Sequence, residues 1–135
     1  MKKSIKILAL TLVLVMSAVL LASCGGPNAD PDDAVAALKE NEYAAAKDTI
    51  IVPNILKALG VDGIDCVVSG SATIDEKFET VTIIYFESKD DANDAWEKVQ
   101  KYADDEKDSK AEDWICKKSG ALIYFGTPNG AKAAQ

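Results

Sequence analysis

Residues 64–87 read IDCVVSGSATIDEKFETVTIIYFE, and their pattern predicts two β-strands joined by a tight turn. From Ile64 to Ile74, apolar or small residues alternate with mostly polar ones, which is the period of a strand with one buried face. Asp75–Lys77 supplies the turn. From Glu79 to Glu87 both sides of the chain are rich in apolar residues, which favours a position inside a sheet.

Before this hairpin the sequence predicts a helix, a strand and a second, short helix. Asp30 can cap a helix that runs to Asn41, because proline and aspartates fill its first turn. We interpret Tyr43–Val52 as a strand, since Pro53 disfavours helical geometry at the residue before it. Pro53 then begins the short helix, which Gly60 can end.

After the hairpin the sequence predicts a long helix, a second hairpin and a last helix. Ser88 and the acid three residues later resemble a capping box, and apolar residues then recur at helical spacing until Asp104–Glu106. Lys118–Gly120 has the composition of a hairpin turn between two further strands. Thr127 begins a helix that continues to the end of the chain.

This order of elements indicates the α+β class and resembles a ferredoxin-like βαββαβ core with an added helix at each end. The resemblance implies one antiparallel sheet with helices packed on one face and the other face partly solvated. We expect residues 31–135 to form a single domain, which residues 24–30 join to whatever precedes it as a short tether.

The composition limits the chemistry of the chain. It has 135 residues without histidine or arginine, and beyond residue 23 it carries 12 lysines against 22 acidic residues, a net charge of −10. The usual base near neutral pH and the usual bidentate anion clamp are therefore missing, and the acidic balance argues against nucleic acid as a partner. A domain of this size needs neither metal nor disulfide to hold a core, so we expect no cofactor.

The N-terminus has the features of an export signal. Lys2, Lys3 and Lys6 precede an uncharged run from Ile7 to Leu21, which is short for a membrane-spanning helix and is followed by small residues.

The four residues Leu21-Ala22-Ser23-Cys24 resemble the lipobox of bacterial lipoproteins, a resemblance confined to residues 1–24. It implies a diacylglyceryl thioether at Cys24, cleavage by signal peptidase between Ser23 and Cys24, an acylated (palmitate-type) N-terminus and anchoring on the extracytoplasmic face of a cell membrane. Two acyl chains hold a protein on a membrane almost permanently. The alternatives are an ordinary secretory signal with a free Cys24, or an uncleaved helix.

The remaining cysteines, Cys66 and Cys116, both fall on predicted strands. Outside the cytoplasm they could pair as a disulfide, but a ferredoxin-like order places their strands at opposite sheet edges, which favours two buried free thiols. A catalytic thiol is disfavoured because there is no histidine to take its proton.

The acidic clusters of the chain do not match a known metal loop. One cluster comprises Asp90, Asp91 and Asp94, and the other comprises Asp104, Asp105, Glu106 and Asp108. Neither has the alternating ligands and glycine of a calcium loop, so we interpret both as solvated helix ends. We expect Asp65 to lie on a solvated strand face. Gly126–Gly130 lacks the lysine of a phosphate loop, so we interpret it as a capped corner rather than an anion site.

Four aromatic residues form the best candidate interaction surface: Tyr85, Phe86, Tyr124 and Phe125. Neighbours on a strand point to opposite faces, so one of each pair must face away from a single helical layer. The alternative is that packing buries both faces.

The sequence thus predicts a lipid-anchored cell-envelope protein with a non-catalytic binding domain, whose partners are the membrane and an envelope protein. The alternative is a sensor that binds a small solute or a cation. An enzyme ranks last, because the residue pattern contains no nucleophile with its base, no metal cage and no phosphate cradle.

Overall fold

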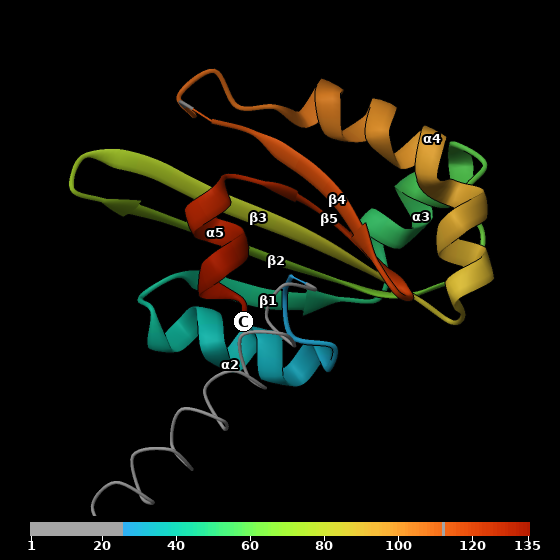
Figure 1. Cartoon of the computed structure of the whole chain (residues 1–135), viewed down its shortest axis with the longest axis horizontal. Coiled ribbons are helices and arrows are strands. Elements are labelled where there is room, and N and C mark those ends of the chain that lie inside the picture. Colours follow the sequence, from blue (N-terminus) through green and yellow to red (C-terminus); the bar gives the residue numbers. More distant parts are fainter. Residues whose placement is uncertain (1–25, 112) are drawn as a thin grey trace, which may run out of the picture.

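The computed structural model describes residues 26–111 and 113–135 and contains five strands and four helices, drawn in Figure 1. The elements follow in the order α2 (Pro31–Glu40), β1 (Ala44–Asp48), α3 (Ile51–Ala58), β2 (Ile64–Ile74), β3 (Lys77–Phe86), α4 (Lys89–Glu106), β4 (Ile115–Ser119), β5 (Leu122–Gly126) and α5 (Pro128–Ala133). The predicted α+β class is confirmed.

The strands form one sheet in the order β1-β2-β3-β5-β4, and every neighbouring pair is antiparallel. The hairpin of β2 and β3 is the centre of the fold, with Val68 opposite Ile83 and Ser69 opposite Thr82. The ferredoxin-like strand order is wrong. A split βαβ core separates the strands that a helix joins, whereas β1 and β2 flank α3 in the chain and pair directly.

Helices cover both faces of the sheet, so the expectation of helices on one face is also wrong. We call the two sides the α2/α5 face and the α3/α4 face. The buried core of the first contains Leu38, Cys66, Val68, Ile83 and Tyr85, and that of the second contains Leu56, Val67, Ile84, Val99 and Ile123. The reason is that β3 and β5 carry apolar side chains on both sides of the sheet, so helices must bury both sides.

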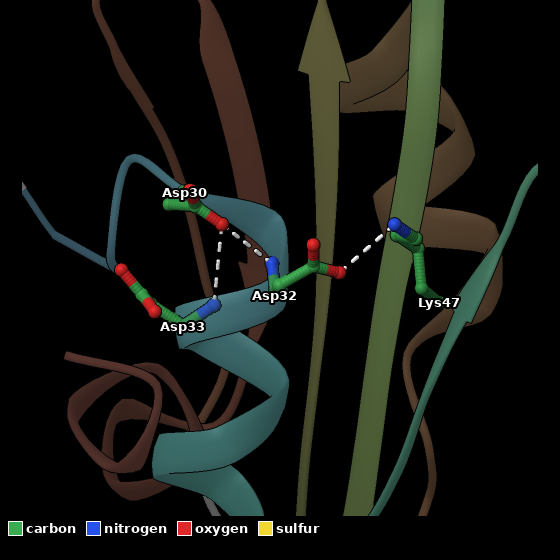
Figure 2. A network of polar contacts seen from close by, with 4 residues as sticks. All are labelled: Asp30, Asp32, Asp33 and Lys47. Atoms are coloured by element: carbon green, nitrogen blue, oxygen red, sulfur yellow. Dashed lines mark hydrogen bonds and ion pairs between the residues drawn. The ribbon is translucent and has the colours of Figure 1, made fainter.

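Capping residues set the helix starts. Asp30 Oδ1 accepts hydrogen bonds from the backbone N–H groups of Asp32 at 2.8 Å and Asp33 at 3.3 Å, as predicted, and Figure 2 shows this cap beside the 2.8 Å ion pair from Lys47 Nζ to Asp32 Oδ1. At α4, the Ser88 hydroxyl accepts from the Asp91 N–H at 3.1 Å.

The second helix begins earlier than the sequence predicts. The strand expected over residues 43–52 ends at Asp48, whose carboxylate accepts the N–H groups of Ile50, Ile51 and Val52 at 2.8 to 2.9 Å. This acidic cap starts α3 at Ile51, so Pro53 lies within the first turn, where its missing N–H leaves no helical hydrogen bond unmade.

Candidate functional site

The predicted lipidation site lies outside the described residues. Cys24 and the predicted signal peptide before it belong to residues 1–25, and the described chain begins at Gly26. What the structure shows is the position of the segment that begins at Gly26.

Residues 26–30, which we call the N-terminal strap, are fixed against the α2/α5 face. Pro27 is buried. The Asn28 N–H donates to the Ala134 carbonyl at 2.9 Å, and the Asn28 carbonyl accepts from the Tyr85 hydroxyl at 2.6 Å. Gly26 lies so close to the Tyr124 ring that a Cβ atom there would stand 2.5 Å from it. The strap is therefore part of the fold, which corrects the expectation of a free tether up to residue 30.

The four residues of the predicted aromatic interaction surface form no exposed patch, because all four side chains are at most 6% exposed. Tyr85 and Tyr124 belong to the core of the α2/α5 face, where the strap contacts them, while Phe86 and Phe125 belong to the core of the α3/α4 face. The burial of both faces that we gave as the alternative is what the fold contains.

Cys66 and Cys116 are free thiols on opposite faces of the sheet. Cys66 lies in the α2/α5 core and Cys116 packs against the α3/α4 core, with β3 and β5 between their strands. Burial raises the pKa of each thiol to about 11, with the nearby carboxylates of Asp65 and Asp104 adding to the respective effects. Both are thus protonated and weakly nucleophilic at neutral pH.

The acidic clusters lie at helix ends, as predicted. Asp90 and Asp91 are in the first turn of α4, and Asp104–Glu106 form its last turn. Asp108 Oδ1 accepts the Lys110 N–H at 2.8 Å. Within residues 26–111 and 113–135, no three His, Cys, Asp or Glu side chains come together as a metal site would require.

The corner before α5 is capped by its own threonine. Thr127 Oγ1 accepts from the Gly130 N–H and from the Thr80 N–H, both at 3.1 Å, and it donates to the Thr80 carbonyl. These bonds satisfy the hydroxyl and N–H groups that an anion would have needed, which confirms the capped corner. Asp65, as expected, is exposed on β2.

A groove on the α3/α4 face is the best candidate binding site. It encloses about 290 Å³ and is lined by residues of the sheet, of α3 and α4, and of the loop before β4. We call it the trough. Its floor consists of Ser69, Thr80 and Thr82, and its aromatic wall consists of Phe78, Tyr102, Trp114 and Phe125. Glu106 and Asp108 form an acidic rim, and Val52 lines the side next to α3. A shallower hollow across β1 shares Ser69 and Thr80 with it.

The aromatic wall of the trough is held in place by ring packing and a hydrogen bond. The Tyr102 and Phe125 ring centroids are 5.9 Å apart in an edge-to-face arrangement, and those of Trp114 and Phe125 are 6.2 Å apart. Trp114 Nε1 donates to the Ala103 carbonyl at 3.2 Å. A rigid, amphipathic wall of this kind binds apolar groups at little entropic cost.

An exposed apolar ridge on α3 adjoins the same face. Ile51, Ile55 and Leu59 follow at helical spacing and are 68%, 45% and 53% exposed, and Ile50 beside them is 65% exposed. Leu56, on the inner side of the same helix, is fully buried. Large apolar side chains gathered on one side of a helix mark a surface for interaction.

A second, smaller cavity surrounds a buried carboxylate near the start of β3. Glu79 is 7% exposed; its Oε1 accepts from Asn129 Nδ2 at 3.3 Å, and its Oε2 has no hydrogen-bond partner. The cavity of about 190 Å³ is also lined by Glu76, Asp113 and Lys110. A buried carboxylate oxygen without a donor is energetically costly, so this cavity favours a cationic or hydrogen-bond-donating group.

Sequence reasoning missed both cavities. The alternation along β2 did predict that Ser69 and Ser71 face solvent, and a matching Thr80 and Thr82 on β3 would have indicated a polar sheet floor. The wall could not be foreseen, because Tyr102 and Trp114 come from α4 and from the loop before β4.

In comparisons with known proteins, no family model, curated protein or solved structure matches the chain. In the part of the chain that the structure describes, no helix is long and apolar enough to cross a membrane.

Proposed function

We propose that this chain is a lipid-anchored protein of the bacterial cell envelope whose domain is a non-catalytic binding module. The anchor is supported by the charged head, apolar run and Leu-Ala-Ser-Cys motif of residues 1–24. The binding role is carried by one observation, the exposed apolar ridge of α3, a helix whose Val52 also lines the aromatic trough.

The partner proposed for this surface is an amphipathic segment of another envelope protein that carries apolar and basic side chains. Its apolar side chains would cover the α3 ridge and enter the trough. Its lysines or arginines would meet Glu106 and Asp108 on the rim, in a domain whose overall charge is strongly negative. Charge complementarity of this kind mainly accelerates association and rejects acidic partners.

A binding role is favoured over catalysis because the described residues offer little reactive chemistry. The sequence has no histidine, and the raised pKa values of Cys66 and Cys116 keep both thiols protonated at neutral pH. On the trough floor, the Thr80 hydroxyl donates to the Gly70 carbonyl at 3.1 Å and not to a carboxylate that could take its proton, an arrangement suited to binding.

The anchor is tested by mass spectrometry of the mature N-terminus and by flotation with membranes. The lipoprotein proposal predicts a peptide that begins at a diacylglyceryl-modified Cys24, and a Cys24→Ala variant that keeps its signal peptide. An unmodified N-terminus on a freely diffusing protein would refute it.

The binding surface is tested by placing a photoreactive amino acid at Ile55 in living cells. Ile74 is the matched control, since it is also an exposed isoleucine, 38% exposed, but lies at the end of β2 away from α3. We expect a discrete crosslinked product from position 55 alone, and we expect it to weaken at least fivefold in the variant Glu106→Lys with Asp108→Lys. Equal products from both positions, or none from position 55, would reject this surface.

A second candidate function, sensing of a small cation, is favoured by the unpartnered Oε2 of Glu79. The cavity suits a primary ammonium group better than a metal ion, because the described residues gather no set of metal ligands there.

Ethylammonium chloride should then raise the melting temperature of the wild-type domain more than sodium chloride does at the same concentration. The Glu79→Gln variant should lose this difference, while Glu97→Gln, which changes an exposed acid on α4 outside the cavity, should keep it. An equal shift in all three proteins would exclude the site.

A further inference from the structure

The strap places the domain unusually close to its proposed point of attachment. Asn28 is held on both sides, by Ala134 through its N–H and by Tyr85 through its carbonyl, and Pro27 is buried. Gly26, with φ at +94°, lies against the Tyr124 ring. The fixed part of the chain therefore reaches back to Gly26 and leaves only Gly25 between it and Cys24.

This short link limits how the domain can sit on a membrane. Two residues span at most ~7 Å even when fully extended. A free tether through residue 30 would have reached ~20 Å at the same rise per residue and would have let any face turn toward the lipid. The part of the surface around Gly26 must instead stay next to the residue that carries the acyl chains.

We propose that the α2/α5 face is the membrane-proximal surface of this protein, seated beside the bilayer headgroups, and that the trough opens away from the membrane. This inference rests on the proposed lipidation of Cys24. The sheet lies between the two faces, so a link of one residue cannot bring both to the bilayer (Figure 1).

The charges on the proximal face show that the anchor, and not adsorption, sets this orientation. Asp30, Asp32 and Asp33 lie where the strap meets α2, and among the described residues only Asp32 of these three forms an ion pair, with Lys47 (Figure 2). Anionic headgroups repel such a cluster. The orientation therefore does not require anionic lipid and should be seen on a purely zwitterionic bilayer.

The orientation also serves the proposed binding role. The α3 ridge and the trough lie on the distal face, where a partner in the space outside the membrane can reach them without crossing the headgroup layer. The strap thus links the position of the lipid to the exposure of the binding surface.

The test uses the full mature lipoprotein in phosphatidylcholine vesicles that contain a headgroup-attached fluorescence quencher. One fluorophore is attached at neutral pH to Lys39→Cys on α2 or to Asp105→Cys at the end of α4; both positions are exposed, and the two native thiols of the domain are buried or half-buried and protonated. We expect at least threefold stronger quenching at position 39 than at position 105.

The matched control inserts eight Gly/Ser residues between Gly25 and Gly26, which leaves the strap contacts intact but frees the orientation. Quenching at the two positions should then become equal. Equal quenching without the insertion, or stronger quenching at position 105, would overturn the orientation while flotation and the lipidated peptide still supported the anchor. A protein that neither floats nor carries lipid would overturn both proposals.

Discussion

The Tyr85 hydroxyl donates a 2.6 Å hydrogen bond to the backbone carbonyl of Asn28, which joins the C-terminal end of β3 to the N-terminal strap. Tyr85 is 5% exposed, and burial raises its pKa well above the usual range of tyrosine. The hydroxyl thus remains a donor across the physiological pH range. The side chain of Tyr85 therefore helps to fix the strap against the α2/α5 face.

Replacing this hydroxyl should loosen the strap. Tyr85→Phe removes the donor and leaves the Asn28 carbonyl without it, at a cost of about 1 kcal/mol in the free energy of unfolding. Tyr124→Phe is the matched control, since Tyr124 is equally buried in the same core but no hydrogen bond of its hydroxyl is seen among the described residues. Urea denaturation measures both, and equal losses would show that the Tyr85 bond contributes nothing.

A side chain at Gly26 should displace the strap. Ala at this position adopts a positive φ, costing ~1–2 kcal/mol, and its Cβ also meets the Tyr124 ring. Gly120→Ala carries the first cost without the second, because φ is +59° there and no atom lies within 4 Å. Thermal unfolding should place Gly26→Ala below Gly120→Ala in stability, and the reverse order would contradict the packing of the strap.

The two thiols of the domain should react slowly in the folded protein. Both have a pKa near 11, so at pH 7.5 little thiolate is present to attack an alkylating reagent. We expect labelling of Cys66 and Cys116 in the native domain to be at least tenfold slower than in urea, where both react. A disulfide-linked peptide in the mass spectrum would contradict their placement on opposite faces.

The free energy of unfolding of the domain should fall at alkaline pH. The pKa values of Cys66 and Cys116 are raised by burial, as are those of Tyr43, Tyr102 and Tyr124. The folded state keeps these protons where the unfolded chain loses them, so their stabilising effect is complete below about pH 8 and declines as the pH rises through the folded values. Denaturation curves between pH 7 and pH 11 should show this fall, with a smaller slope in Cys66→Ala; a flat profile would exclude it.

Asp48 should make α3 sensitive to acid. Hydrogen bonds from the N–H groups of Val52, Ile50 and Ile51 lower the pKa of its carboxyl. The unfolded chain therefore takes up a proton before the folded one does, and the contribution of the cap, complete above about pH 5, is lost as the pH falls through the lowered value. Asp48→Ala should cost about 1 kcal/mol at pH 7, and Asp48→Asn, which retains an acceptor, less; a variant as stable as wild type would show that the cap is not needed.

Much of the secondary structure could be predicted because its signals are local. The alternation of Ile64–Ile74 and the caps at Asp30, Ser88 and Thr127 were sufficient for β2, α2, α4 and α5. The start of α3 was misplaced because Pro53 was taken as the first helical residue, while the carboxylate of Asp48 caps the helix from outside it.

The sequence by itself determined the α+β class and the acidic charge balance, and it carries the pattern from which an export signal is predicted, since each depends on residue types or their short spacing. Only the tertiary structure decided that helices cover both faces, that the four strand aromatics are buried and that the strap is fixed. Those outcomes depend on contacts between residues far apart in the chain, such as Asn28 with Ala134 and with Tyr85, for which short-range spacing carries no signal. The trough has the same origin, because its floor, wall and rim come from different elements and meet only when the sheet forms.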